Sequence, residues 1–434
     1  MYLRSKLKTY FLLSSFFISL NGYAQLSAEE KKQTVYSTLE ILKSKYVSSD
    51  ILPELERTII QSYINGKYDT ISTGNEFAFQ LTRDLQKISK DQHLKVLYNE
   101  NKNAAEQGAQ QQGLPKDQWL KKLMIENNYS IKEKAILSGN IGYINIPVFG
   151  PLIDCADTLI AAMNYVKNTN ALIIDLRDCR GSLDENTIPF IFSYFFKDPV
   201  HIGDFYTRET HTTKQFWTYG YVPGALYLDK PIYVLTSGKT FSGGEAFAYH
   251  LQQLKRGVII GEVTRGGANP SELQKINSNF SITVPYAKSI SPVSQTNWEN
   301  IGVKPDVEVR SVLAFYEANL LALRKLISLS KDLSAKADLE RALFELKRPV
   351  FKKVMFLLEG FGDAREVAVA GTFNSFSRKS FLLKKVDGKW MGEAEVEPGD
   401  LSYVFVVDNR IIKDPKNPKT VTTNGNENSY LFVK

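Results

Sequence analysis

Apolar residues recur at helical spacing through the first part of the chain. The pattern predicts three helices, over residues 34–46, 52–63 and 75–88. A strand-like run at 95–98 follows them, and the glutamine-rich stretch 106–113 predicts a surface loop. After the first 24 residues, we therefore expect a helical N-terminal subdomain over residues 25–135.

From residue 141 the pattern changes to short apolar runs separated by helical stretches. The runs that predict buried strands are 141–147, 171–176, 231–236, 258–261 and 280–285. Strands that alternate with helices are typical of an α/β core with mainly parallel pairing. We place this core at residues 136–310, and the charged amphipathic stretch 311–348 predicts helix that packs back onto it, within a connector at 311–349.

After Pro349 the pattern changes again, to short strand-like runs separated by turn signals. The turn dipeptides are Asp387-Gly388, Pro398-Gly399 and Asp408-Asn409. Short strands at this spacing predict a small β-sandwich over residues 350–434.

The start of the chain has the pattern of an export signal. Arg4, Lys6 and Lys8 precede an apolar run at 10–20, and small residues follow as far as Ala24. A run of about 11 residues is too short to cross about 30 Å of hydrocarbon. We therefore expect residues 1–24 to be a signal peptide, and the protein to be periplasmic or secreted without stable membrane insertion.

Composition excludes some classes of protein and leaves others open. The chain has 434 residues, 43% of them hydrophobic and 23% charged, which is ordinary for globular domains. Its net charge of +7 is modest, and basic and acidic residues are interspersed, so nucleic-acid binding is not expected. Cys155 and Cys179 lack the C-x-x-C spacing of a structural zinc site, and we expect no metal or other cofactor. The two cysteines could form a disulfide or remain separate buried thiols.

A hydroxyl stands where a buried strand is followed by a tight turn and a helix. The strand ends at Thr236 and the helix is expected to begin near Ser242. Backbone N–H groups and the helix dipole favour negative charge at such a position, so Ser242 suits a nucleophile and the Gly243 N–H suits an oxyanion donor. Ser242-x-x-Glu245 is also a capping box, which is a purely structural alternative.

A second strand end carries a glycine that could complete this site. The segment 175–181 runs from an apolar strand into a loop that contains Gly181. A second backbone donor, at Gly181, would face the same oxyanion, and one such donor is worth roughly 3–4 kcal/mol. The alternative is an ordinary strand-to-helix turn.

A serine nucleophile needs a base, and the chain has four histidines. His250 lies two helical turns beyond Ser242, roughly 12 Å along the axis, which is too far to share a proton. His201 and His211 flank an aromatic-rich segment, which predicts either a substrate-covering loop or packed surface. His93 stands where the helical region gives way to a strand.

Five motifs in order carry a family resemblance. They are Asp-x-His-Leu at 91–94, Asp-Leu-Arg-x-x-x-Gly at 175–181, Thr-Phe-Ser-Gly-Gly-Glu at 240–245, Gly-Glu-x-Thr-x-Gly-Gly-Ala-Asn at 261–269 and Trp-Glu-Asn-Ile-Gly-Val-Lys-Pro-Asp at 298–306. Over residues 30–310 the chain resembles the C-terminal-processing (tail-specific) serine peptidases, in their interphotoreceptor-retinoid-binding-protein-like, tricorn-core-like branch. The resemblance implies a crotonase-like ββα core with a helical N-terminal subdomain. The stretch from Tyr98 to Ile141 is too short for the PDZ insertion of many relatives.

The resemblance also implies roles for individual residues. Relatives with a Ser-Lys dyad have a lysine at the position of Gly267, whereas the tricorn-like branch uses serine, histidine and glutamate. By that resemblance the nucleophile is Ser242, the general base His93, the orienting carboxylate Glu299 and the oxyanion donors Gly243 and Gly181. The implied substrate is a peptide or unfolded protein. Two positions depart from the pattern: Ser182 replaces a glycine, and Gln92 replaces a serine that helps link base to carboxylate.

The last segment resembles a second family. The run 367–376, Trp390, the strand 403–408 and Asp414-Pro415 resemble the glycogen-binding module of the AMP-activated-kinase β subunit, which implies an immunoglobulin-like early-set β-sandwich. The sugar-binding positions are occupied by Phe376, Ile411 and Val404. We expect the fold to be retained and glycan contact to be lost or weak. A carrier of hydrophobic ligands and a glycan-targeted protein are the alternatives to an exported serine endopeptidase.

Overall fold

The structure, a computed structural model, describes residues 26–99 and 116–434 apart from 375, 379, 409 and 424–425. The predicted signal peptide at 1–24, the loop at 106–113 and Asn409 of the last predicted turn lie outside the described residues. Among the described helices, none combines the length and the apolar character needed to cross a membrane.

Three helices open the described chain and confirm the predicted helical region. They are α1 (Ala28–Lys45), α2 (Leu52–Ile64) and α3 (Gly74–Ser89), with a short 3₁₀ turn, η1 (Ser49–Ile51), before α2. The Ser27 and Thr73 side chains accept hydrogen bonds from backbone N–H groups three residues on, and so cap α1 and α3. The apolar faces of these helices pack together in one buried cluster.

A small antiparallel sheet joins this helical region to the rest of the chain. It has the order β1 (Lys95–Tyr98), β10 (Phe280–Pro285) and β9 (Ser271–Lys275), with Val96 opposite Ile282. The prediction that 280–285 belongs to the parallel core is therefore wrong. The apolar side chains of β10 are buried against the N-terminal helices, and an apolar run alone does not say which core it enters.

The predicted α/β core is confirmed as one six-stranded sheet. Its order is β12 (Val307–Glu308), β8 (Val258–Gly261), β7 (Ile232–Thr236), β4 (Ala171–Asp175), β3 (Ile141–Asn145) and β2 (Glu133–Leu137). The pairs from β12 to β3 are parallel, and β2 pairs antiparallel with β3. The pattern did not predict β2, because its charged and half-exposed residues lack a clear apolar alternation.

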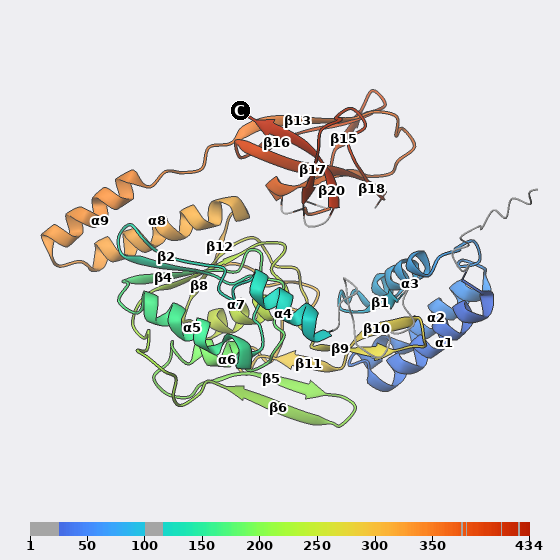
Figure 1. Cartoon of the computed structure of the whole chain (residues 1–434), viewed down its shortest axis with the longest axis horizontal. Helices are drawn as coiled ribbons and strands as arrows, with labels where there is room; N and C mark the ends of the chain where they lie inside the picture. Colours follow the sequence, from blue (N-terminus) through green and yellow to red (C-terminus); the bar gives the residue numbers. More distant parts are fainter. Residues whose placement is uncertain (1–25, 100–115, 375, 379, 409, 424–425) are drawn as a thin grey trace, which may run out of the picture.

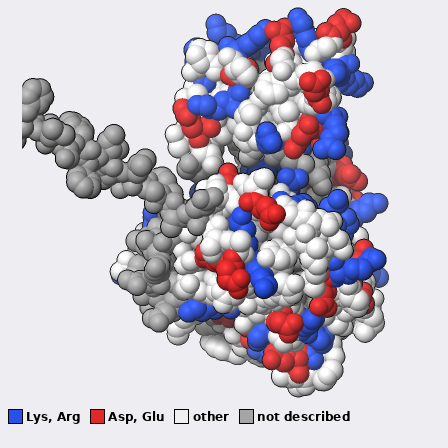
Figure 2. Space-filling model, turned by 90° about the vertical axis from the view of Figure 1, so that its right-hand side faces the viewer, with Lys and Arg blue, Asp and Glu red and all other residues white. Residues whose placement is uncertain are grey.

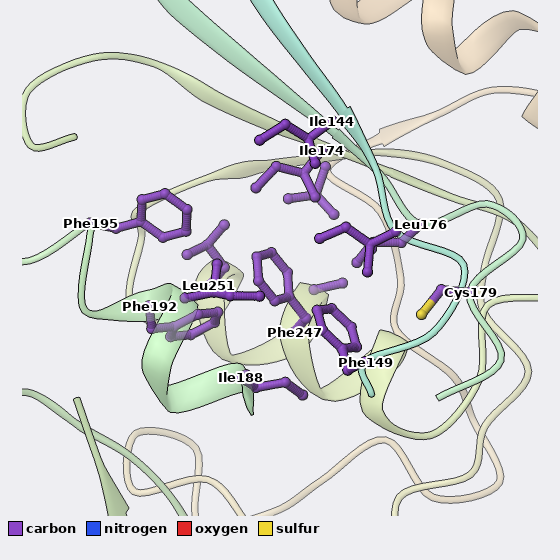
Figure 3. Close-up of a cluster of buried hydrophobic side chains, with 14 of the residues drawn as sticks. Ile144, Phe149, Ile174, Leu176, Cys179, Ile188, Phe192, Phe195, Phe247 and Leu251 are labelled. Carbon is purple, nitrogen blue, oxygen red and sulfur yellow. The ribbon is translucent and has the colours of Figure 1, made fainter. Parts of the chain in front are cut away.

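Helices cover both faces of the sheet (Figure 1). Alternate strand residues such as Ile144 and Ile174 pack with α5 (Leu152–Val166), α6 (Thr187–Phe192) and α7 (Gly243–Gln253), as Figure 3 shows in part. The helix α4 (Lys116–Glu126) adds Met124 to this cluster. The opposite face, which includes Tyr143, packs against α8 (Ser311–Leu329) and α9 (Leu333–Glu345). The predicted helical stretch 311–348 is thus two helices that do pack onto the sheet.

The aromatic-rich segment between His201 and Tyr221 begins with a β-hairpin. The strands β5 (His201–Thr207) and β6 (Thr212–Trp217) pair antiparallel, and β11 (Ala287–Ile290) adds to β5. The hairpin places Trp217 on the surface, where its ring stacks on His201.

The C-terminal segment is β-rich, as predicted. One sheet has the order β13 (Lys352–Leu358), β16 (Lys389–Val396) and β15 (Lys384–Val386). The other has β14 (Val367–Gly371), β17 (Gly399–Val407), β20 (Asn426–Val433) and β19 (Thr420–Thr423), with β18 (Arg410–Ile412) on β17 and a 3₁₀ turn η2 (Thr372–Asn374) after β14. The described strands pair antiparallel around buried aromatic residues that include Phe356 and Phe405.

The surface charges are mixed in sign, and the two cysteines do not form a disulfide. On the face in Figure 2, basic and acidic side chains are interspersed. Cys155 and Cys179 are both buried and free, so the two cysteines are separate thiols.

Candidate active site

Ser242 stands at the start of α7, after the loop that follows β7. Its backbone has φ +51° and ψ −116°, in a left-handed region that costs a non-glycine residue energy. The Ser242 N–H donates to Glu245 Oε2 at 2.8 Å. The predicted capping box of Ser242 and Glu245 is therefore present, in a strained turn of the kind that functional sites retain.

Gly181 and Gly243 bring two loops into contact beside Ser242. A Cβ on Gly243 would lie 2.5 Å from the Ser182 nitrogen, and one on Gly181 would lie 3.1 Å from Ser242 Cβ. Gly181 also has φ +126°, which only glycine adopts readily. Among the hydrogen bonds of the described residues, none uses the N–H of Gly181 or Gly243 as donor. Both groups are thus adjacent to Ser242 and free to donate to a bound oxyanion.

Ser182 is accommodated without strain in the position where relatives have a glycine. Its hydroxyl donates to the Asp184 carbonyl oxygen at 2.6 Å, within its own loop. The Ser182 backbone does not have a positive φ, so the conformation has no need of glycine.

His93 reaches the site from the loop between α3 and β1. Its ring packs on that of Phe241, the residue before Ser242, with 4.7 Å between centroids and 33° between planes. A Cβ on Gly267 would lie 2.7 Å from His93 Cε1 and 2.2 Å from the Phe241 ring. The imidazole and the Phe241 ring therefore close the space into which a side chain at 267 would extend.

No hydrogen bond of the described residues joins the Ser242 hydroxyl to the His93 ring. Their link in this state is the Phe241 ring, which contacts His93 and is bonded through the backbone to Ser242. Catalytic hydrogen bonds are often long in ligand-free sites and tighten on substrate binding.

The other three histidines have partners of their own. His201 Nε2 lies 2.6 Å from Asp204 Oδ1, and His211 Nδ1 lies 3.1 Å from the Tyr206 hydroxyl. The buried His250 ring packs edge-on against Trp298, with 5.6 Å between centroids. None of these contacts involves Ser242.

Two carboxyl groups lie beside His93. The Asp91 Oδ1 is 3.7 Å from His93 Nδ1, and donor atoms of Asp91, His93 and Glu299 lie within 4.8 Å of one another. The Glu299 Oε2 accepts the N–H groups of Ala268 and Asn269, at 2.6 and 3.1 Å. Within the described part of the chain, His93 Nδ1 and Glu299 Oε1 are buried atoms without a hydrogen-bond partner. The structure thus brings the predicted base and carboxylate together.

The surroundings of Glu299 favour its protonated form. Burial raises the pKa of Glu299 to about 7, and the neighbouring charge of Asp91 acts in the same direction. The backbone N–H of Ala268 and the imidazole of His93 oppose this shift, because both stabilise the carboxylate. The Glu299 carboxyl group is therefore poised to change charge near neutral pH.

Sequence reasoning assigned no role to Asp91, Tyr46 or Arg265, and it gave Glu245 only a role in a capping box. Asp91 stood in a quoted motif, but whether its side chain faces His93 depends on the loop conformation. Arg265 Nε donates to Gln92 Oε1 at 2.6 Å, and its guanidinium lies over the Phe241 ring. Gln92 therefore contacts Arg265, and Asp91 is the residue of this motif that stands beside the imidazole.

Glu245 ties the loop after β8 to the start of α7. Its fully buried carboxylate accepts hydrogen bonds from the Thr264 hydroxyl and from the N–H groups of Gly266 and Gly267, in addition to that of Ser242. Burial raises the pKa of Glu245, while these four donors lower it. The side chain holds Gly267, which lies under His93, in a fixed relation to Ser242.

Asp91, His93 and Glu299 are also the described group whose donor atoms are close enough to hold a metal ion. Both Asp91 oxygens already accept hydrogen bonds, from the His93 N–H and the Tyr46 hydroxyl, and Glu299 Oε2 accepts two more. Of the carboxylate oxygens in this group, Glu299 Oε1 is the one that no donor among the described residues holds.

Comparison with known proteins decides the family. Residues 140–309 match the model of peptidase family S41, and residues 27–135 match the N-terminal domain of S41 peptidases in eukaryotic IRBP. The chain carries a peptidase family S41 domain. The S41 domain holds Ser242, Gly181, Gly243 and Glu299, whereas His93 lies in the N-terminal domain. Residues 355–434 match the glycogen recognition site of AMP-activated protein kinase.

Curated relatives of the S41 domain are processing peptidases. The chain is 25% identical over 181 residues to carboxyl-terminal-processing peptidase 2, chloroplastic, of Arabidopsis thaliana, covering 39% of this chain and 32% of the relative. It is 27% identical over 192 residues to a carboxy-terminal-processing protease of Bartonella bacilliformis, covering 42% of each. The chain thus spans less than half the length of the curated relatives it matches.

A solved structure with a similar fold covers much of the chain. Mature CPAF superposes with a TM-score of 0.50 at 11% identity, covering 70% of this chain and 99% of that chain. At this identity the likeness concerns the fold alone. The family resemblances that the motifs predicted, for both parts of the chain, are confirmed.

Proposed function

We propose that the protein is an exported serine endopeptidase that cleaves peptide bonds through Ser242, His93 and Glu299. One observation carries the proposal: the His93 ring, which comes from the helical region, packs against Phe241 at the start of the nucleophile helix, with carboxyl groups beside its Nδ1. The S41 match supports the reaction class. Substrates of this class are peptides or unfolded segments that can enter the site as extended chain.

The reaction follows the general logic of acyl transfer. Ser242 Oγ attacks the carbonyl carbon of the scissile bond while its proton passes to His93 Nε2, because Nδ1 is the nitrogen near the carboxyl groups. The N–H groups of Gly181 and Gly243 stabilise the oxyanion, at roughly 3–4 kcal/mol for each donor. His93 then gives the proton to the departing amine as the C–N bond breaks.

The second half of the reaction regenerates the enzyme. Water gives a proton to His93 and attacks the acyl ester, the ester bond breaks, and the proton returns to Ser242 Oγ. During each step Glu299 stabilises the imidazolium. Two backbone N–H groups fix its Oε2, which leaves Oε1 to accept from His93 Nδ1–H.

The proposal includes the domain organisation and the finer fold labels. We assign residues 1–24 to a cleaved signal peptide, 25–135 to a helical subdomain, 136–310 to a crotonase-like peptidase core, 311–349 to a helical connector and 350–434 to an immunoglobulin-like early-set sandwich. The parallel sheet with helices on both faces and the two antiparallel C-terminal sheets support these assignments.

A carrier of hydrophobic ligands is less well supported than a peptidase. Drug-sized ligands occupy cavities of about 300–1,000 Å³. The apolar cavity between the sheet and α5, lined by residues such as Ile144 and Leu159, has a volume of only about 10 Å³. That cavity is too small for a retinoid or a fatty acid.

A fluorophosphonate probe tests the proposed nucleophile. The probe modifies an activated serine, so we expect covalent labelling of the full chain and a labelled peptide that contains Ser242 after digestion and mass spectrometry. Ser237 and Ser182 lie in the neighbouring loops and serve as internal controls, because both hydroxyls are bonded to backbone carbonyl oxygens. Labelling at either of these serines, or none, would contradict the assignment.

The C-terminal module is expected to bind glucans weakly or not at all. Val404 is buried, Phe376 packs against the apolar cluster that includes it, and the half-exposed Ile411 has no flat ring to stack on a sugar. In native gels that contain glycogen, we expect the full chain to migrate as it does without glycogen, whereas a glycogen-binding protein is retarded. Retardation of this chain that Phe376→Ala removes would show a working sugar site.

A further inference from the structure

Asp91 is held beside the imidazole from two directions. It is 2% exposed, and its Oδ1 accepts the His93 backbone N–H at 2.9 Å while lying 3.7 Å from His93 Nδ1. Its Oδ2 accepts the hydroxyl of Tyr46 at 3.0 Å. Tyr46 caps the C-terminal end of α1 and is itself 1% exposed. The carboxylate is therefore fixed before any substrate arrives.

The charges around His93 make this arrangement significant. The titratable groups that face its ring are Asp91, Glu299 and, through Asp91, Tyr46. Arg265 is on the Phe241 side and Glu245 bonds Gly267, so neither neutralises the two carboxyl groups directly. Burial and the Asp91 charge raise the pKa of Tyr46, so its hydroxyl remains a donor. The His93 ring thus faces both buried carboxyl groups.

We propose that Asp91 is a positioning residue of the active site, which holds His93 from its Nδ1 side and stabilises the imidazolium together with Glu299, with Tyr46 as its anchor. This inference rests on the proposed function. It places Asp91 in the linking position between base and carboxylate for which a serine was expected at residue 92. Two carboxyl groups, rather than one, then stabilise the positive charge that develops on His93.

The matched substitutions are isosteric. In Asp91→Asn the amide oxygen can still accept the His93 N–H, so the local turn is kept while the negative charge is lost. Tyr46→Phe removes the anchor and keeps the charge. The chain offers a control pair in the same region: Asp84 is buried and accepts the Tyr68 hydroxyl at 2.9 Å, but it pairs with Lys67 and not with His93.

The readout is the pH profile of peptide hydrolysis. We expect Asp91→Asn to lower kcat by up to about 100-fold, the cost of a misplaced catalytic group, with KM changed less than about twofold. Loss of the Asp91 anion removes one cause of the raised pKa of Glu299, so the acid limb of kcat/KM moves to lower pH. Tyr46→Phe lowers kcat less strongly, and Asp84→Asn leaves the profile in place.

Three other results would overturn the role of Asp91. A wild-type rate and profile in Asp91→Asn, or a loss of rate with an unmoved acid limb as in a destabilised protein, would overturn the role of Asp91. Inhibition by EDTA that Zn²⁺ reverses would show that the three donors hold a cation, and would also overturn it. Failure of the proposed function is distinguishable, because wild type would then show no Ser242-dependent hydrolysis or labelling.

Discussion

Replacement of Ser242 by alanine is expected to abolish peptide hydrolysis, with a fall in kcat of about 10⁴-fold or more. The substitution removes the atom that forms the acyl bond, and neither His93 nor the glycine N–H groups can replace it. The fold should persist, because the Ser242 N–H that bonds Glu245 is a backbone group and remains. The measurement is hydrolysis of a quenched fluorescent peptide, together with the melting temperature.

Ser182→Ala is the matched control for this experiment. Its hydroxyl bonds the backbone of its own loop, so its loss should change kcat by less than about tenfold. Equal rates for wild type and Ser242→Ala would remove Ser242 from the mechanism, whatever the family of the domain.

Replacement of Gly267 by alanine should strongly lower kcat, although it removes no reacting group. The new Cβ would lie 2.2 Å from the Phe241 ring and 2.7 Å from His93 Cε1, so both rings must move. A displacement of about 1 Å in a catalytic group costs up to about 100-fold in rate. Overpacking of this kind also destabilises a fold by about 1–3 kcal/mol, so the melting temperature is measured beside kcat.

Gly220→Ala provides the control, because no atom lies within 4 Å of a Cβ at that position. This variant should keep the wild-type rate and melting temperature. A fully active, folded Gly267→Ala variant would mean that His93 does not occupy its observed place during catalysis.

Much of the fold followed from the pattern of apolar positions. The N-terminal helices and the parallel strands have strong periodicity and buried faces, so local sequence was sufficient to predict them. The strand 280–285 was assigned to the wrong sheet, because its apolar run is equally suited to either core and the choice depends on tertiary packing. The edge strand β2 was missed because its exposed residues have little apolar signal.

The site shows the same division between local and long-range information. Ser242 and Gly243 follow from a strand, a turn and a helix start, which are contiguous in sequence. His93 and Glu299 came only with the family resemblance, since spacing cannot show that distant loops converge. Asp91 had no such signal: its partner Tyr46 belongs to another helix, and only the folded chain brings the two together.

The pairing of β1 with β10 has a consequence for how the protein is built. His93 lies two residues before β1. The strand β10 lies in the segment that runs from the loop of Gly267 to Glu299. The backbone pairing of β1 with β10 thus ties the loop of His93 to the segment that leads from Gly267 to Glu299. A chain cut between the helical region and the parallel sheet would leave β10 without its β1 partner and Ser242 without His93, so the proposed peptidase site needs the N-terminal helices as well as the sheet.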